Sequence, residues 1–142
     1  MRGRNWLIGL MALAAANFAT ASEGEVEYRE HTMEAIGGHM QAAVDILRQK
    51  VPHASHMPIH ADALAALAGI VDTLFPEGSE GGDALPAIWE NPEDFAERVG
   101  AMRDAATAFS AAANANDSAA LGEAFQTLGQ ACKGCHDNYR AD

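Results

Sequence analysis

The sequence is short of cysteine and of basic residues, and both shortages restrict what the protein can do. Its 142 residues include only two cysteines, Cys132 and Cys135. A disulfide between them would close so small a loop that it would hardly constrain the unfolded chain, so the chain is not a disulfide scaffold. Lysine and arginine number 9, against 20 aspartates and glutamates. This balance disfavours nucleic acid and anionic membranes as partners, because phosphates must be met by positive charge.

Long apolar runs are missing outside the amino terminus. Residues 1–21 have the pattern of a secretory signal peptide, with two arginines, an apolar run from Trp6 to Ala16 and a small-residue cleavage pattern. The run is shorter than the ~20 residues that span a bilayer. We therefore predict cleavage near Ala21, no membrane insertion and an exported domain over residues 22–142 with a formal charge of −13.

Strand signals are absent too. No stretch alternates apolar and polar residues convincingly, β-branched residues are sparse, and alanine is abundant. Four amphipathic segments, separated by breaks rich in Pro, Gly, Asn and Asp, instead predict an all-α fold. The expected architecture is an antiparallel four-helix bundle, with its longest link between the second and third helices.

Each helical segment has a predicted buried stripe. The stripe of the first, which ends at Pro52, consists of Val26, Met33, Ile36, Met40, Val44, Leu47 and Val51. That of the second, at about 59–75, consists of Ile59, Ala63, Leu67, Ile70 and Leu74. The third segment opens at Asn91 and Pro92, a helix cap followed by proline, and its stripe consists of Phe95, Val99, Met102, Ala106 and Phe109. The fourth begins near 116–118 and carries Leu121, Phe125 and Leu128 toward the two cysteines.

Cys132, Cys135 and His136 match Cys-x-x-Cys-His, the attachment pattern of c-type haem. Thiols three residues apart share one face of a helix, so both can add to the vinyl groups on one edge of a porphyrin. His136 can then reach the iron. The alternatives are a zinc site, which would need a second pair of ligands, a redox-active pair, which belongs at a helix start, and a chance pairing. We predict one covalent haem c.

Three further segments, YR, EGGD before PAIW, and ACKGCHDNYR, stand in order over nearly the whole mature chain. In these segments the chain resembles the cytochrome c' superfamily, including its low-spin cytochrome c-556 branch. The resemblance implies a periplasmic four-helix bundle with one haem near the carboxyl end. It implies thioethers at Cys132 and Cys135, a proximal iron ligand at His136, and a basic residue beside that ligand at Arg140.

The resemblance also bears on the other side of the iron. In cytochromes c' an apolar side chain faces the iron from the first helix, and the open position binds nitric oxide or carbon monoxide. In the c-556 branch a methionine ligates there, and Met33, four residues after Arg29, matches that position. A thioether favours reduced iron and suits an electron carrier. Met33 also lies on the apolar stripe, so core packing is the alternative, and His39 is a remote rival as ligand.

Three polar residues are expected at the haem edge. The resemblance places Arg29 beside the haem, where it can pair with a propionate. Glu30 follows it, although many relatives carry an uncharged glutamine there, and Asp83 belongs to EGGD. Tyr139 is expected to cover the same edge.

The remaining histidines suggest a metal site only weakly. His53, His56 and His60 lie close in sequence, but Met57 and Pro58 interrupt them, so we expect a surface loop rather than zinc. We expect His31 and His39 to be exposed.

The sequence leaves three functions to compare. The first is an electron-transfer protein, not an enzyme, that exchanges electrons with a redox partner protein. The second is a binder of nitric oxide or carbon monoxide. The third is a small helical interaction module without haem. Homodimers are common in the resembling family, but one core accounts for the apolar residues here.

Overall fold

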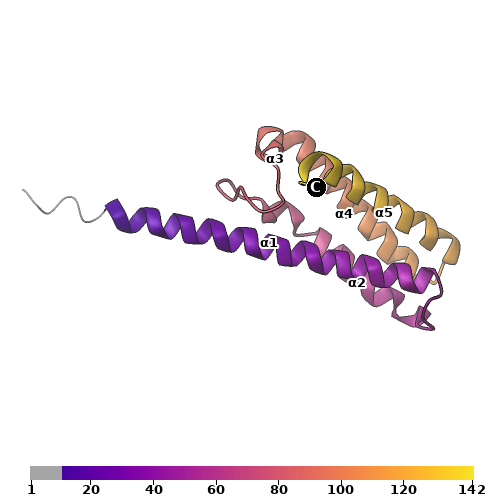
Figure 1. Cartoon of the computed structure of the whole chain (residues 1–142). Helices are drawn as coiled ribbons and strands as arrows, with labels where there is room; N and C mark the ends of the chain where they lie inside the picture. The colour runs from indigo at the N-terminus through magenta and orange to yellow at the C-terminus, as the bar shows by residue number, and fades with distance from the viewer. Residues whose placement is uncertain (1–10) are drawn as a thin grey trace, which may run out of the picture.

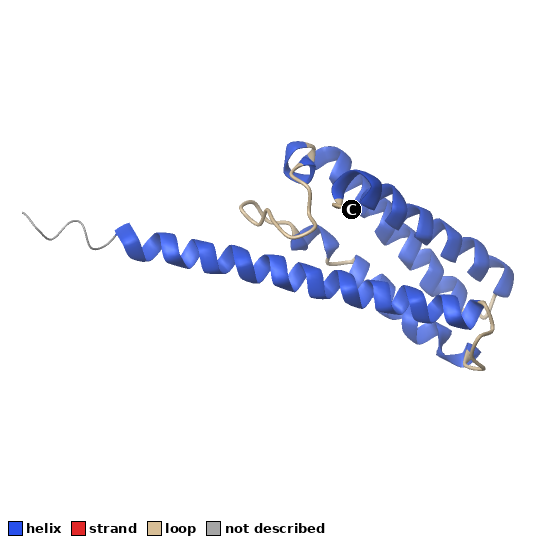
Figure 2. Ribbon diagram, in the orientation of Figure 1, coloured by secondary structure: helices blue, strands red, loops and turns tan. Residues whose placement is uncertain are grey.

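The computed structural model describes residues 11–142, with side chains from Ser22 onward, and is a bundle of four long helices (Figures 1 and 2). The long helices are α1 (Met11–Leu47), α2 (Met57–Ala68), α4 (Pro92–Asn114) and α5 (Ser118–Tyr139). The short elements are η1 (Ala54–His56), η2 (Val71–Leu74) and α3 (Ala87–Glu90). Residues 11–142 contain no strand, only two isolated bridges. The predicted all-α bundle is confirmed.

The predicted signal peptide falls largely outside what can be described. Residues 1–10 lie outside the described part of the chain, and of residues 11–21 only the backbone is described, as the start of α1. This start extends beyond the other long helices (Figure 1). Cleavage near Ala21 and the boundary at residue 22 stay predictions. In the part of the chain that the structure describes, no helix combines the length and the apolar character needed to cross a membrane.

The third and fourth predicted segments agree with α4 and α5. The whole predicted stripe of α4, from Phe95 to Phe109, is buried. Asp117 caps α5, because its carboxylate accepts the N–H groups of Ala119 and Ala120 at 3.1 and 3.0 Å. Asn91 is the N-cap residue of α4 and Pro92 follows it, as predicted, but the Asn91 side chain makes no capping hydrogen bond and donates backward to the carbonyl of Ala87 at 3.2 Å.

The predicted stripe of the second segment is mostly wrong, since only Leu74 of its five residues is buried. Ile59 is 63% exposed, and the buried side chains of α2 are Met57, Ala61, Leu64 and Ala68. The helix also ends at Ala68. The chain then forms a separate short 3-10 helix, η2, so there is no single helix that extends to Phe75. Alanine and leucine occur on several faces of this segment, so their spacing does not identify the face that meets the neighbouring helices.

Helix α1 ends earlier than Pro52 suggested. Its last residue is Leu47, and Gln49 adopts a positive φ of 56° that turns the chain. Val51 therefore lies after the helix and is 37% exposed, not part of the core. A left-handed residue ends a helix without any proline, so Pro52 gave only an approximate boundary.

The two ends of the bundle are packed differently. Helix α4 packs along α5 and against α2, and α2 packs against α1, whereas α1 and α5 make almost no direct contact. At the closed end, Leu64, Phe109 and Leu128 are fully buried, and Phe109 packs against Phe125 with ring centroids 5.3 Å apart. At the cavity end, α1 and α5 stand apart, and the link between η2 and α4 contacts both α1 and the end of α5 (Figure 1).

Candidate haem site

The cavity end encloses about 650 Å³, lined by side chains from α1, η2, α4, α5 and the link between η2 and α4. Most of the lining is apolar, including Ile36, Val71, Ile88 and Val99. All seven predicted site residues line it, namely Arg29, Glu30, Met33, Asp83, Cys132, Cys135 and His136. The fold thus brings together residues that are more than 100 positions apart in the sequence.

The two thiols and the imidazole come from the last turns of α5. Cys132 and Cys135 are half-buried free cysteines in this structure. In a haem-bearing protein, their sulfur atoms would be those of the thioethers. Burial raises the pKa of both thiols, which shows how apolar their surroundings are. Their three-residue spacing places both on the cavity side of the helix, as the attachment pattern requires.

His136 is half-buried beside Arg140, one turn further along the chain. Burial, and then the positive charge of Arg140, lower the pKa of His136. The Nη1 atom of Arg140 lies 3.3 Å from Nδ1 of the imidazole. Both effects favour the neutral ring, the form that ligates a metal. Within residues 22–142, Nε2 has no hydrogen-bond partner and is the nitrogen left for ligation.

Arg29 anchors the link before α4 to α1. Its side chain is 3% exposed, and its Nη1 donates to the carbonyls of Leu74 at 3.3 Å and Ser79 at 3.0 Å. Its Nη2 donates to the carbonyl of Gly81 at 2.9 Å, and the guanidinium lies 5.0 Å from the ring centroid of Phe75. These contacts were not foreseen, because carbonyls of an irregular segment carry no sequence pattern.

Arg29 is also a buried cation without a carboxylate in contact. Among residues 22–142 it forms no ion pair, and burial lowers its pKa although Glu30 and Glu25 lie near enough to raise it. A buried charge of this kind is costly unless an opposite charge meets it. A cavity with two thiols, a neutral imidazole and a buried cation at its rim therefore fits haem c, whose propionates are anionic.

Glu30 and Asp83 are exposed residues at the cavity rim. Glu30 packs against Gly82, where φ is +56° and a Cβ would collide with the Glu30 carboxylate. The backbone carbonyl of Asp83 accepts the N–H of Ala141 at 2.8 Å, and Leu85 donates to the carbonyl of Tyr139 at 3.0 Å. The link is thereby joined both to α1 and to the chain after α5.

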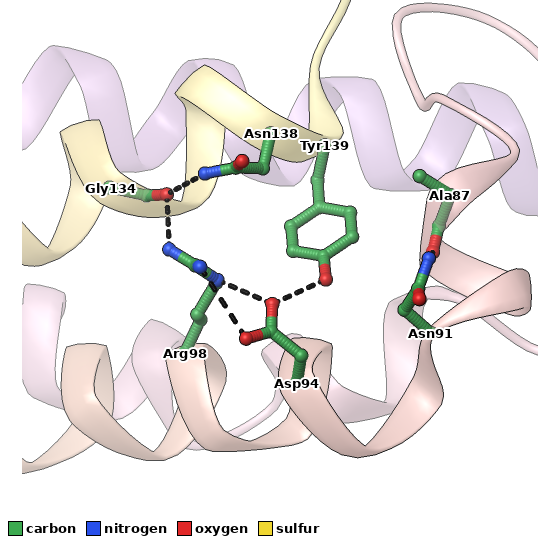
Figure 3. A network of polar contacts seen from close by, with 7 residues as sticks. All are labelled: Ala87, Asn91, Asp94, Arg98, Gly134, Asn138 and Tyr139. Carbon is green, nitrogen blue, oxygen red and sulfur yellow. Dashed lines mark hydrogen bonds and ion pairs between the residues drawn. The ribbon is translucent and has the colours of Figure 1, made fainter.

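A polar network that the sequence analysis did not predict joins α4 to the attachment segment, residues 132–136 of α5 (Figure 3). Arg98 donates to the carbonyl of Gly134, between the two cysteines, at 2.7 Å. It also donates through Nε to Asp94 at 2.7 Å, and the hydroxyl of Tyr139 donates to the same carboxylate. The hydrogen bond from Arg98, and then that from Tyr139, hold the pKa of Asp94 below its usual range. The four-residue spacing of Asp94 and Arg98 was the only available signal.

Three methionines line the cavity: Met33 and Met40 from α1, and Met102 from α4. The sequence predicts Met33 as a candidate iron ligand, and Met40 and Met102 as core residues. His39, the rival ligand, does not line the cavity, because its ring contacts His60 on α2. Tyr139 does line it, and packs edge-on against Phe95 with centroids 5.2 Å apart.

Comparisons with known proteins agree with this site. A family model described as cytochrome C' matches residues 24–140. The chain is 36% identical to cytochrome c' of Pararhodospirillum photometricum over 121 residues, which cover 83% of this chain and 97% of that protein. It is 40% identical to a cytochrome c-556 of Agrobacterium tumefaciens over 122 residues, with coverages of 82% and 97%.

Solved structures give the same result. Recombinant native cytochrome c' from Alcaligenes xylosoxidans matches with a TM-score of 0.80 at 32% identity, covering 85% of this chain and 97% of that one. A nitric oxide complex of a variant of that protein matches with the same TM-score, identity and coverages. The sequence match, the bundle and the cavity with its thiols and imidazole agree: the chain belongs to the cytochrome c' family of monohaem proteins with covalently attached haem c.

Proposed function

We propose that the protein is an exported electron-transfer cytochrome in which His136 and Met33 ligate the haem iron from opposite sides. The observation that carries this proposal is the position of Met33, which lines the cavity from α1, the helix that lies across the cavity from α5. Cys132 and Cys135 would hold the haem covalently, and Arg29 would meet a propionate.

Haem bound in this cavity would supply a one-electron ferric–ferrous couple. The chain's own part is to set the environment of that couple. A soft thioether from Met33 favours the reduced state, and the apolar lining from Ile36, Ile88 and Val99 excludes water. Because the network of Arg98 and Asp94 fixes the attachment segment, little needs to move when charge changes. We assign to no residue of the cavity the role of a catalytic acid or a nucleophile.

A second function, capture of nitric oxide or carbon monoxide, has its own support. Structures of the Alcaligenes xylosoxidans relative include nitric oxide complexes. In this alternative, Met33 is a packing residue like Met40 and Met102, and a gas molecule takes the position on the α1 side. Methionine is common as adaptable core filler, so its presence in the cavity fits this function as well.

The visible spectrum of the purified protein distinguishes the two functions. Ligation by Met33 predicts low-spin spectra with a methionine-to-iron charge-transfer band and no change on adding carbon monoxide. Met33→Leu should then give a high-spin spectrum that responds to carbon monoxide. Met40→Leu and Met102→Leu are matched controls, because both residues line the same cavity, and neither should change the spin state. If the spectrum of the wild-type protein is already high-spin, the gas-binding function is supported instead.

The proposal includes a periplasmic location and a redox partner of neutral or basic surface, since the mature chain carries a formal charge of −13. The mass of the protein purified from the periplasm checks the amino terminus, which should follow Ala21. Its oligomeric state, including the homodimer that the family resemblance suggests, is checked by sedimentation.

A further inference from the structure

Outside the haem site, two histidines from different helices are held in contact. Nδ1 of His39, on α1, lies 3.0 Å from Nδ1 of His60, on α2. Their ring centroids are 5.3 Å apart and their planes are tilted by 57°. Both rings are half-buried, and neither lines the haem cavity. The sequence suggested a different grouping of His60, with His53 and His56 in a loop.

The separation of the two nitrogens is that of neighbouring ligands on one metal ion. Imidazole nitrogens bind metals at about 2.0–2.1 Å, so two of them at tetrahedral to right angles lie roughly 2.9–3.4 Å apart. The 3.0 Å between His39 and His60 falls within this range. Without metal, one Nδ1 must carry a proton for the other to accept. When that proton moves to Nε2 of its own ring, both Nδ1 lone pairs become available and no proton is lost.

The other close pair of histidines lacks this geometry. The rings of His53 and His56 stack in nearly parallel planes, 12° apart with centroids 4.9 Å apart, so their lone pairs do not converge. Both rings are exposed around the short helix η1. By contrast, His39 and His60 are half-buried, and their Nδ1 atoms lie 3.0 Å apart.

We propose that His39 and His60 form a binding site for one divalent transition-metal ion, with Cu²⁺ bound more tightly than Ni²⁺ or Zn²⁺. Imidazole is a preferred ligand of these ions, and the general order of affinities places Cu²⁺ first. Residues 11–142 contain no group of three or more potential ligands, so water completes the coordination. The formal charge of −13 on the mature chain assists the approach of a cation.

A metal ion at this site links α1 to α2. It stabilises the folded protein by an amount that increases with the free metal concentration, because both ligands are in place only when the two helices are packed together. The melting temperature therefore rises with metal concentration, while the haem spectrum stays unchanged because the site shares no residue with the cavity lining.

The test uses the untagged holoprotein in its ferric state, so that Cu²⁺ is not reduced. Calorimetric titration with CuCl₂, and separately with ZnCl₂, should show one ion per chain, and native mass spectrometry should show one ion for every chain, whether the protein is a monomer or a dimer. His39→Gln and His60→Gln should each weaken binding by at least about tenfold. His31→Gln and His53→Gln, which alter exposed histidines, should leave the affinity unchanged.

Three results overturn the proposal. The first is no Cu²⁺ binding by the wild-type protein. The second is equal binding by the wild type, His39→Gln and His60→Gln, which places the ion elsewhere. The third is one ion per two chains in a dimeric mass, which means that the ion bridges copies. Circular dichroism and the haem spectrum without metal confirm that the variants are folded, so a loss of binding is not a loss of structure.

Discussion

The closed end and the cavity end of the bundle use the same kind of sequence for opposite purposes. At the closed end, Leu64, Phe109 and Leu128 are fully buried between the helices. At the cavity end, residues of the apolar stripes of α1 and α4, including Met33, Val99 and Met102, line a cavity of about 650 Å³. An apolar stripe therefore specifies a buried face, but it does not specify whether protein or a prosthetic group covers that face.

The ends also differ in what joins the helices. At the closed end, the helices are held together mostly by apolar packing. At the cavity end, Arg29 is bonded to backbone carbonyls, and Arg98, Asp94 and Tyr139 join α4 to α5. A cavity that must receive a large group cannot be held by core packing alone, so polar contacts around its rim position the surrounding segments. The following predictions test this contrast.

The largest effect is expected from Cys132→Ala combined with Cys135→Ala. No thioether can form, so the protein should not retain its pigment after acid–acetone extraction. The unfilled cavity end should lose helical order, while the closed end keeps its own core. Hydrogen exchange measured segment by segment checks this, with slow exchange expected near Phe109 and fast exchange near Val99. Uniform exchange along α4 would mean that the two ends are not separate units.

The next effect is expected from Phe109→Ala at the closed end. Phe109 is fully buried, and its truncation should lower the free energy of unfolding by about 3–5 kcal/mol. The haem spectrum should stay that of the wild type, because Phe109 does not line the cavity. Urea unfolding followed by circular dichroism measures the loss. A changed spin state in this variant would show that the ends are coupled through α4.

Arg29→Met tests the rim of the cavity. The carbonyls of Leu74, Ser79 and Gly81 lose their donor, so we expect the free energy of unfolding to fall by about 1–3 kcal/mol. Arg103→Met, a change at an exposed arginine of α4, is the matched control and should have little effect. Urea titration of both variants makes the comparison. Equal stability of the two would mean that the link before α4 does not depend on Arg29.

The smallest effect is expected from Asp94→Asn and appears only in acid. Because hydrogen bonds lower the pKa of Asp94 in the folded protein, its stabilising contribution is present above its ordinary pKa near 3.8 and is lost as the pH falls below that value. The melting temperature of the variant should therefore fall less steeply than that of the wild type below about pH 4. Melting curves between pH 3 and 6 measure this slope.

Asp62→Asn is the companion variant at the contact of α2 and α4. Hydrogen bonds from Ser110 and then Asn114 lower the pKa of Asp62, so its acid dependence should have the same sign. Only Asp94 is linked through Arg98 to the attachment segment, so only Asp94→Asn should shift the pH at which the haem spectrum changes. A similar spectral shift in both variants would contradict a local role for the network.

Much of the site could be predicted because its chemistry is local in the sequence. Cys132, Cys135 and His136 lie within five residues of one helix, and their spacing matches the attachment pattern of c-type haem. The contacts of Arg29 and Arg98 could not be predicted, since both donate to backbone carbonyls, which every residue carries. The pairing of His39 with His60, 21 positions apart, was not foreseen because it depends on how α1 packs against α2.

The sequence by itself determined the number of long helices, the buried stripe of α4 and the placement of the attachment motif, because helical periodicity and thiol spacing are properties of neighbouring residues. The tertiary structure alone decided which face of α2 is buried, where α1 ends, and that α1 and α5 stand apart around a cavity. These outcomes depend on the surfaces that other helices present. An alanine-rich helix can pack against its neighbours through more than one face, so the buried face is determined only when the bundle assembles.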